Sequence, residues 1–359
     1  MRILLVSHRF DPDVGGIETV VGRQAENLAE KGHEVRVVTT TGDESIIGER
    51  NERGLIVNRV SRIAPNNSFF FSPKVGRLVG DLAGEYDIIH AHNYHALPAL
   101  HAFRNRGRSV FVLTAHYHRT SDNRFRNMLL GPYRKIAKRM VERSDSVICV
   151  SESERALLEG DFAIQEIHVN YNAVEAVKGT FERVQGAFCI IGRIEKYKKI
   201  EQAIISFEKA ISRIDSEISL HIVGDGPERS RLENMVERRG LVNHVKFYGF
   251  VSVEEKDRIL SSSSCLLALS SHESFGITVV EAAKQNVPII ASDIPAHREL
   301  ASLLGEGVSI VDSEDIGSIS DEIVRLVSSD FNSRFNNLEV FTWERNTEKL
   351  LEIYDGLLA

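Results

Sequence analysis

The stretch that decides the fold is Ser264–Asp293, with the sequence SCLLALSSHESFGITVVEAAKQNVPIIASD. An apolar run ends at Ser270, a polar loop then holds Glu273, and Gly276 opens a helical segment that carries Glu281. A second apolar run, PIIASD, follows the helix and ends the stretch. A strand, a helix and a further strand in this order predict a parallel βαβ unit.

The same alternation extends outward from this stretch in both directions. The earlier strand-like runs are ILLVSH (3–8), EVRVVTT (34–40), YDIIHAH (86–92), SVFVLTAH (109–116) and DSVICVS (145–151). The later runs are AFCIIGR (187–193), SLHIVGDG (219–226), HVKFYGF (244–250), SCLLALS (264–270), PIIASD (288–293) and GVSIV (307–311). Helical periodicity appears at Ile17–Lys31, Ile200–Ile211 and Glu228–Arg239. Two such series predict two doubly wound α/β domains with parallel sheets, changing over near residues 165–185.

Length and composition agree with two ordinary globular domains. The chain has 359 residues, of which 42% are hydrophobic and 26% charged. It contains no apolar run of about 18 residues, and MRILLVSHRF becomes polar too soon for a secretory signal. Each of the three cysteines sits in an apolar run, which is typical of buried core residues. We therefore expect a cytoplasmic protein without disulfides.

The charge is unevenly distributed along the chain. The net charge of −7 argues against nucleic acid as a partner, yet residues 101–143 hold eleven Lys and Arg against two acids. Within residues 124–143 these cations alternate with apolar side chains, a pattern typical of peripheral contact with an anionic membrane. Two other interpretations stay open: a solvated helix face, or a cationic wall for a phosphorylated acceptor.

The residues after the strands suggest a ligand site. Gly276 would let a phosphate or pyrophosphate approach the amides of a helix start. Glu273 and Glu281 are eight residues apart, ~12 Å at the helical rise, and carboxylates accept hydrogen bonds from paired hydroxyls. From the residues alone, two glutamates on a solvated helix face remain possible.

This stretch resembles the E-x7-E signature of the retaining glycosyltransferases of family 4, which have the GT-B architecture. The resemblance implies two Rossmann-like domains facing a central cleft: an acceptor-binding domain at 1–168, completed by a C-terminal helix at about 342–359, and a nucleotide-sugar domain at 169–341. It further implies that Glu273 holds hydroxyls of the donor sugar and Glu281 those of the ribose. The amides that would face the diphosphate belong to Ser274, Phe275, Gly276 and Ile277.

A second match is GRIEKYKKI, residues 192–200, which follows a predicted strand. Arg193 and Lys198 are two cations placed to neutralise charge that develops on a leaving pyrophosphate. The family pattern is G-R-L…K-G, and this chain departs from it with Lys199 in place of glycine. The G-D-G-P turn at Gly224–Pro227 is a smaller match.

The loop DPDVGGIET, residues 11–19, resembles the glycine-rich loop that closes over the donor diphosphate in this family. Gly15 and Gly16 would allow the backbone to approach phosphate closely. Asp11 and Asp13 form a D-x-D pattern, which binds metal in the other major glycosyltransferase fold. That pattern is common by chance, and the resemblance is to the metal-independent architecture, so we expect neither metal nor cofactor.

Several histidines follow predicted strands: His90, His92, His95, His116 and His118. A His-x-His pair can bind metal, but no cysteine or carboxylate cluster completes a site. The family has T-x-H at the position of Thr114 and His116 and places this histidine near the donor sugar. The resemblance therefore makes His116 a candidate catalytic residue together with Glu273, Arg193 and Lys198.

The function implied is that of a retaining glycosyltransferase. It would move a sugar from a nucleotide-diphosphate donor, UDP first and GDP next, to a lipid-linked, saccharide or small-molecule acceptor. The alternatives are a sugar-nucleotide epimerase of the same architecture and a non-catalytic sugar-nucleotide-binding protein. A nicotinamide-dependent dehydrogenase is disfavoured because GDGPER has Arg229 where the third glycine of G-x-G-x-x-G would fall.

Overall fold

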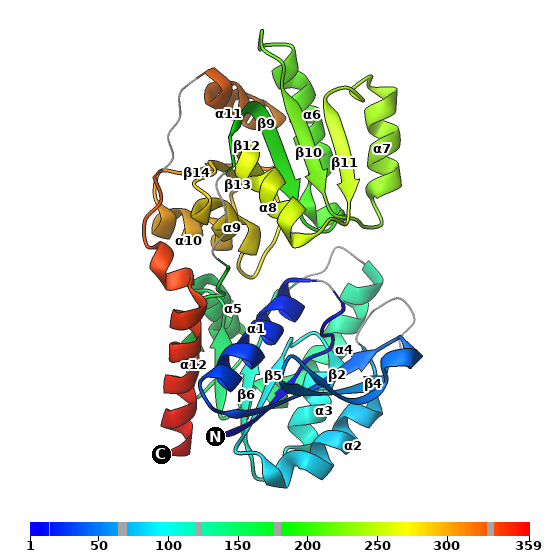
Figure 1. Ribbon diagram of the computed structural model, residues 1–359, viewed down its shortest axis with the longest axis vertical. Helices are drawn as coiled ribbons and strands as arrows, with labels where there is room; N and C mark the ends of the chain where they lie inside the picture. Colours follow the sequence, from blue (N-terminus) through cyan, green and yellow to red (C-terminus); the bar gives the residue numbers. More distant parts are fainter. Residues whose placement is uncertain (14, 64–69, 120–123, 176–180, 329–333) are drawn as a thin grey trace. The chain divides into compact units, whose positions relative to one another are not determined.

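The protein is described here by a computed structural model that divides into two compact units (Figure 1). It describes residues 1–13, 15–63, 70–119, 124–175, 181–328 and 334–359, without the side chains of 124–130. The first unit consists of Met1–Ala173 and Val340–Ala359, and the second of Val174–Glu339. The first unit therefore extends beyond residue 168, its expected end. Two hydrogen bonds join the chain after that residue to the C-terminal segment of the same unit. The Asn346 side chain donates to the Tyr171 carbonyl oxygen, and the Asn346 carbonyl accepts from the Asn170 side chain.

The first unit combines strands and helices in near-regular alternation. Its strands are β1 (Arg2–Val6), β2 (Glu34–Thr41), β3 (Gly48–Glu52), β4 (Leu55–Ser61), β5 (Ile88–His92), β6 (Val110–Thr114), β7 (Ser146–Cys149) and β8 (Ile167–Val169). Its helices are α1 (Gly16–Glu30), α2 (Pro73–Leu82), α3 (Leu97–Asn105), α4 (Arg124–Glu142), α5 (Glu152–Asp161) and α12 (Trp343–Leu358). Short 3-10 turns are η1 (Glu44–Ile46), η3 (Ala83–Glu85) and, at its border, η5 (Leu338–Phe341).

These strands form one sheet in the order β3-β4-β2-β1-β5-β6-β7-β8. Every pair is parallel except β3 with β4, which is antiparallel. Alternate residues of β1 enter different cores: Leu4 and Val6 pack toward α2, α3 and α4, whereas Ile3 and Leu5 pack toward α1 and α12. Both faces of the sheet are therefore covered, which explains why central strands such as β1 are largely apolar.

The second unit repeats the alternation, and the strands among its described residues are all parallel. Its strands are β9 (Val184–Ile191), β10 (Ser219–Val223), β11 (Val245–Gly249), β12 (Ser263–Ala268), β13 (Ile289–Ser292) and β14 (Val308–Val311). Its helices are η4 (Lys196–Lys198), α6 (Ile200–Ile211), α7 (Arg229–Arg238), α8 (Val253–Ser262), α9 (Ile277–Lys284), α10 (Pro295–Leu304) and α11 (Ile316–Ser328). The sheet order is β11-β10-β9-β12-β13-β14, and all pairs are parallel.

The sequence prediction of two doubly wound parallel-sheet domains is confirmed. All eleven predicted strands are present, and the helix over Ile200–Ile211 has the predicted bounds. The sequence analysis missed β3, β4 and the three-residue β8. Strands β3 and β4 are joined by a tight hairpin turn in which Arg53 and Gly54 both have positive φ (50° and 80°). Arginine is an unusual residue in such a turn, so the sequence carries no clear hairpin signal for these two strands.

Candidate active site

The strand order places the predicted residues of the second unit beyond the carboxyl ends of its central strands. The chain winds from β9 toward β11 on one side and from β12 toward β14 on the other, so the order reverses between β9 and β12. Ligands of such sheets bind outside the carboxyl ends of the strands at this reversal. Arg193 follows β9 and Glu273 follows β12, one on each side of the reversal.

The turn after β10 packs directly against the loop that carries Arg193. Gly224 has φ of 127°, and a Cβ there would lie 1.9 Å from the carbonyl oxygen of Gly192. A Cβ on Gly226 would lie 2.4 Å from the carbonyl oxygen of Ile194. The Ile194 amide also donates to the carbonyl of Asp225 at 2.9 Å. The glycines of this turn therefore have a packing role, since backbone occupies the space of a side chain.

Lys198 and Glu273 come together in the structure. The Lys198 Nζ donates to Glu273 Oε1 at 2.6 Å, and the Ser270 hydroxyl donates to the same oxygen at 2.9 Å. Their side chains are only 18% and 20% exposed. Burial alone would raise the pKa of Glu273, but the Lys198 ammonium and these hydrogen bonds hold the pKa below its ordinary value. Glu273 is thus an ionised carboxylate whose charge Lys198 balances.

The backbone at Lys199 explains why the family pattern has glycine at this position. Lys199 adopts the left-handed conformation, with φ 53° and ψ 34°, between η4 and α6. This region is the one that glycine enters most readily. Its ammonium pairs with Glu314. The loop is also tied to the β12 side, because the Ser271 amide donates to the Tyr197 carbonyl at 2.7 Å.

The contacts of Arg193 differ from those of the Lys198–Glu273 pair. Its guanidinium pairs with Glu195 at 2.6 Å and donates to the Tyr197 hydroxyl at 3.3 Å. Its side chain is 63% exposed, in contrast to that of Lys198. The two predicted phosphate cations therefore differ: Arg193 is at the surface, whereas Lys198 is engaged with a buried carboxylate.

Helix α9 begins at the predicted position, directly after Gly276. This glycine has φ of 102°, and a Cβ there would come within 3.4 Å of the His297 ring and 3.3 Å of Leu300. The ~12 Å between Glu273 and Glu281 was estimated as if all eight residues were helical, and this assumption was wrong. The helix starts only at Ile277, so helical rise applies to four residues, or ~6 Å.

Glu281 has a partner that the sequence analysis missed. Lys256 of α8 donates to Glu281 Oε1 at 2.5 Å, and the two side chains are 22% and 19% exposed. Burial raises the pKa of Glu281, and the Lys256 ammonium offsets only part of that effect. No signal in the sequence links the two, because they come from separate helices 25 residues apart.

In the first unit, His116 and His92 lie at the carboxyl ends of neighbouring strands. Their rings stack with centroids 5.8 Å apart, and His116 has φ of 47°. Among the described residues, the two ring nitrogens of His92 have no hydrogen-bond partner. Within that part of the chain, the same is true of Nε2 of His116. Burial lowers the pKa of His116 to about 4 and that of His92 well below its ordinary value. Both imidazoles are therefore neutral at pH 7.

His90 is bound by structural partners instead. Its Nδ1 lies 2.7 Å from the Tyr354 hydroxyl of α12, and its Nε2 lies 2.7 Å from the Thr114 hydroxyl. His95 stacks on His118 with ring centroids 4.0 Å apart. His90 thus has a hydrogen-bond partner on each ring nitrogen, in contrast to His92.

The predicted glycine loop lies at the start of α1. Gly16 is the first residue of that helix, and Gly15 precedes it in an extended conformation. A Cβ on Gly15 would lie 2.3 Å from the Glu18 carboxylate, which itself lies 3.7 Å from His8. Asp13 lies 3.5 Å from Arg62, so this carboxylate of the D-x-D pattern has a cationic neighbour.

Within the residues that the structure describes, no three His, Cys, Asp or Glu side chains are grouped to hold a metal ion. The same part of the chain contains no helix that is both long and apolar enough to cross a membrane.

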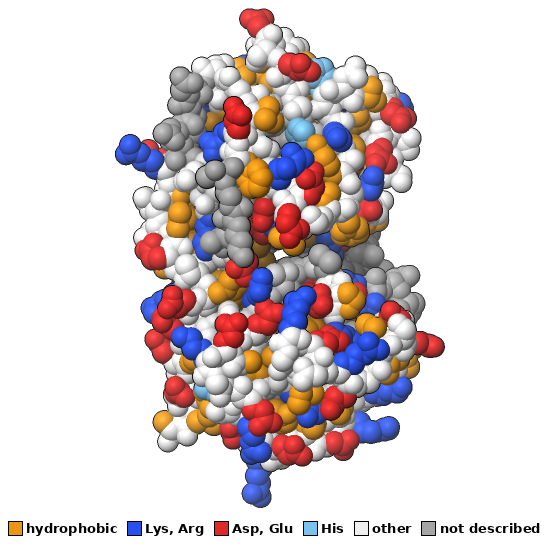
Figure 2. All heavy atoms as spheres, viewed as in Figure 1, with side chains coloured by type: hydrophobic (Ala, Val, Ile, Leu, Met, Phe, Trp, Pro, Cys, Tyr) orange, Lys and Arg blue, Asp and Glu red, His pale blue; other side chains and the backbone are white. Residues whose placement is uncertain are grey.

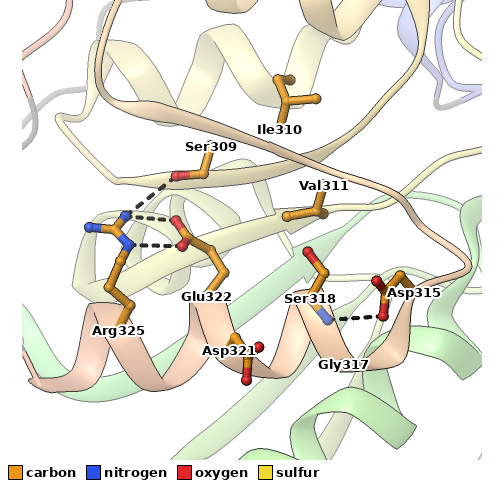
Figure 3. A pocket seen from close by; sticks show the side chains of 9 residues that line it. All are labelled: Ser309, Ile310, Val311, Asp315, Gly317, Ser318, Asp321, Glu322 and Arg325. Atoms are coloured by element: carbon orange, nitrogen blue, oxygen red, sulfur yellow. Dashed lines mark hydrogen bonds and ion pairs between the residues drawn. The ribbon is translucent and has the colours of Figure 1, made fainter.

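A pocket of about 700 Å³ lies elsewhere in the second unit, between β14 and α11 (Figure 3). Arg325 bonds there to Glu322 at 2.6 Å and to Ser309 at 3.4 Å. None of the predicted site residues lines it. Because β14 is an edge strand far from the reversal of the strand order, we do not assign the predicted site to this pocket.

Comparison with known proteins identifies the family. The family described as "Glycosyl transferases group 1" matches residues 178–338, and "Glycosyltransferase Family 4" matches residues 14–178. The chain is 25% identical to a GDP-mannose:cellobiosyl-diphosphopolyprenol alpha-mannosyltransferase of Xanthomonas oryzae pv. oryzae, over 93% of this chain and 90% of that protein.

Solved structures share the fold across both units. A sucrose-phosphate synthase from Thermosynechococcus elongatus gives a TM-score of 0.80 at 20% identity, covering 99% of this chain and 98% of that one. Anabaena Alr3699/HepE in complex with UDP and glucose gives 0.77 at 16% identity, covering 99% and 100%. The chain is therefore a glycosyltransferase of group 1 with the GT-B fold.

Proposed function

We propose that this glycosyltransferase is a retaining enzyme that takes its sugar from a nucleotide-diphosphate donor bound to the second unit. The observation that carries the proposal is the Lys198–Glu273 pair, which joins the two sequence motifs beside the reversal of the strand order. Glu273 would hold hydroxyls of the sugar and Glu281 those of the ribose. Arg193 and the amides before α9 would bind the diphosphate.

The charges of these groups fit departure of a diphosphate. The Arg193 side chain is 63% exposed, and a cation there stabilises the charge that develops as the sugar–phosphate bond breaks. In the retaining reaction, the acceptor hydroxyl attacks the anomeric carbon on the face from which the diphosphate leaves, and a diphosphate oxygen takes the proton. His116, neutral because burial lowers its pKa to about 4, would position the sugar by a hydrogen bond and carry no charge.

The donor is proposed to be a UDP-sugar, with a GDP-sugar as the second choice. Two similar proteins motivate these choices: Anabaena HepE is described with UDP and glucose, and the Xanthomonas relative is named for GDP-mannose. The proposed acceptor is lipid-linked, a saccharide or a small molecule. An epimerase would release no nucleoside diphosphate when acceptor is added, and a non-catalytic binder would turn over no donor.

We further propose that the reaction needs no divalent metal. Arg193 and Lys198 would supply the positive charge that Mg²⁺ or Mn²⁺ supplies in metal-dependent transferases. Activity measured with excess chelator should equal that measured with added Mg²⁺ or Mn²⁺. A loss of activity with chelator that Mn²⁺ restores would contradict this part of the proposal.

Peripheral contact with an anionic membrane through residues 124–143 is proposed for the first unit, on the cytoplasmic face of the membrane. In the described part of this segment, Lys135, Arg139 and Arg143 are exposed at intervals of four residues, with Ile136 half exposed beside them. Figure 2 shows positive and negative side chains intermingled on the face viewed there, without a region of one sign. The proposed contact is made by the exposed cations Lys135, Arg139 and Arg143.

The first experiment is a thermal-shift panel of UDP, GDP and ADP with matching sugar donors. A ligand that binds only the folded chain stabilises it by RT ln(1+[L]/Kd), about 2.7 kcal/mol at a hundredfold excess over Kd. One nucleotide should raise Tm in the wild type, and Glu281→Ala should remove the shift. If no nucleotide raises Tm at millimolar concentration, the donor site is assigned wrongly.

A further inference from the structure

The Lys256–Glu281 ion pair is a tertiary contact between two helices that follow different strands. Lys256 lies in the first turn of α8, after β11, and Glu281 is the fifth residue of α9, after β12. Ser252 caps α8 by accepting from the Glu255 amide, and the Lys256 amide donates to the Ser252 carbonyl at 2.9 Å. The start of α8 is thus fixed by backbone and cap contacts, which sets the Cα position from which Lys256 reaches α9.

The surroundings of Glu281 disfavour a charged carboxylate, and Lys256 offsets part of that effect. Its side chain is 19% exposed, and burial is the largest influence, raising its pKa. The charged groups that face it are Lys256, at 2.5 Å, and Asp257, whose negative charge raises the pKa further. Asp257 itself lies 3.4 Å from the Lys256 ammonium. Among the described residues, Lys256 is the cation that favours the ionised form of Glu281.

Ribose recognition needs this ionised form. A carboxylate offers two oxygens that accept hydrogen bonds, so it can take both vicinal hydroxyls of a ribose as donors. A protonated carboxyl must itself donate one hydrogen bond and accepts correspondingly less well. Hydrogen bonds to an ionised acceptor are also roughly twice as strong as neutral ones. Loss of the charge on Glu281 would therefore weaken nucleotide binding without removing any contacting side chain.

We propose that Lys256 is a positioning residue of the donor site, which holds the Glu281 carboxylate ionised and oriented for the ribose hydroxyls of a nucleoside diphosphate. The inference rests on the proposed function, because it takes Glu281 as the ribose-binding residue. Lys256 acts through Glu281 in this account and needs no contact with the nucleotide.

The test is the pH dependence of UDP binding, measured by isothermal titration calorimetry between about pH 5.5 and pH 8.5. GDP or ADP replaces UDP if the thermal-shift panel selects it. Lys256→Met should bind nearly as well as wild type at the alkaline end and lose affinity on acidification. The expected loss relative to wild type is about tenfold at one pH unit below the new pKa of Glu281. Dividing by the wild-type value at each pH removes the titration of the phosphate itself.

Three controls separate positioning from a structural role. Lys256→Arg keeps the positive charge and should restore the wild-type pH profile. Glu281→Gln should bind weakly at every pH, and adding Lys256→Met to it should change neither the affinity nor the profile. A 2′,3′-dideoxy nucleoside diphosphate should bind the wild type and Lys256→Met equally at all pH values, since it lacks the hydroxyls that Glu281 reads.

The outcomes separate the two proposals. If the wild type binds no nucleotide, or Glu281→Gln binds as well as wild type, the ribose role of Glu281 fails. If Glu281→Gln weakens binding while Lys256→Met follows the wild-type profile within twofold, the donor site stands and the role of Lys256 is overturned. A uniform loss in Lys256→Met at every pH, shared by the dideoxy nucleotide and by Lys256→Arg, would also overturn it, because that pattern reports damage to α8.

Discussion

At Gly224 the backbone leaves no room for a side chain. A Cβ would overlap the Gly192 carbonyl oxygen at 1.9 Å, and the residue has φ of 127°. Gly224→Ala should therefore destabilise the second unit by about 3 kcal/mol or more and weaken nucleotide binding, since it moves the loop that carries Arg193. Thermal denaturation followed by circular dichroism, together with nucleotide titration, measures both effects.

Gly240 provides the matched control for this substitution. It also has positive φ, 70°, but nothing lies within 4 Å of its Cβ position. Gly240→Ala should cost only the conformational strain, about 1 kcal/mol, and leave nucleotide affinity unchanged. Equal effects of the two substitutions would mean that backbone conformation, and not packing on Gly192, makes glycine necessary at Gly224.

The Lys198–Glu273 pair makes stability depend on pH in a definite direction. The pKa of Glu273 lies below its unfolded value of 4.5, so the ionised carboxylate stabilises the fold above that pH and loses this contribution as pH falls through the folded pKa. Glu273→Gln should therefore lose less Tm than wild type between about pH 5 and pH 3.

Lys198→Met should reverse the direction in which Glu273 makes stability depend on pH. Burial would then raise the pKa of Glu273 above its unfolded value, so acidification from neutral pH would stabilise this variant relative to wild type. At pH 7 an uncompensated carboxylate at this depth should cost on the order of 3 kcal/mol. Tm measured across the pH range checks both variants, and parallel curves for all three proteins would show that the pair does not couple to folding.

The residues of the candidate site differ in how far the sequence could predict them. Glu273, Gly276 and Lys198 could be proposed because each belongs to a motif with fixed spacing after a strand. The contact of Lys256 with Glu281 was missed because it depends on the packing of α8 against α9, which no local pattern encodes.

At the scale of elements, α12 is held to the first unit by both apolar and polar contacts. Leu350, Ile353 and Tyr354 join the core beneath α1, and the Tyr354 hydroxyl lies 2.7 Å from His90 Nδ1. Tyr354→Phe keeps the ring but leaves a fully buried nitrogen without its partner, which should cost about 1–3 kcal/mol. Guanidinium denaturation followed by the fluorescence of Trp343, the only tryptophan and the first residue of α12, measures this change.

The control for this helix is Leu350→Ala, which removes apolar packing without touching His90. It should cost about 2–5 kcal/mol, as for other fully buried leucines. Tyr354→Phe should cost less when it is made in a His90→Phe variant, because the nitrogen that it would leave unpaired is already gone. If Tyr354→Phe is as stable as wild type, the His90 contact contributes nothing to holding α12.

The predictability of the elements followed their hydrophobic pattern. The eleven predicted strands are marked by apolar runs, which are most continuous where a strand is buried on both faces, as in β1 and β13. The strand β3, with the sequence GERNE, lies at the sheet edge and is mostly exposed, so its residues carry no apolar signal. Tertiary pairing with β4 makes this segment a strand, and a single sequence does not show that pairing.

At the scale of the whole molecule, the polypeptide passes between the units twice, at Ala173–Val174 and at Glu339–Val340. The sequence placed the first passage near 165–185 from the change of strand series. The side chains of Asn170 and Asn346 explain why the observed division comes at 173, because they bind the chain after β8 to α12. Such side-chain contacts to a helix 176 residues away are invisible to local pattern.

Charge is the whole-molecule property with a testable consequence for location. The chain is acidic overall, with a net charge of −7, so any attraction to an anionic membrane must come from a local cationic surface. Lys135, Arg139 and Arg143 form that surface in the described part of α4 and just beyond it. Arg134 and Lys138, in contrast, pair with Asp161 and Glu142.

Wild-type protein should co-sediment with phosphatidylglycerol vesicles at low salt and dissociate as the ionic strength rises, because screening shortens the range of the attraction to about 10 Å at 0.1 M. Each cation contributes about 1 kcal/mol near such a surface, so the triple variant Lys135→Glu, Arg139→Glu, Arg143→Glu should lower binding by a hundredfold or more, that is by at least about 3 kcal/mol. The control is Lys31→Glu, Arg238→Glu, Lys246→Glu, which changes the net charge equally at exposed positions elsewhere. Equal loss in both variants would show that net charge governs binding, and equal binding to phosphatidylcholine vesicles would exclude an electrostatic contact through α4.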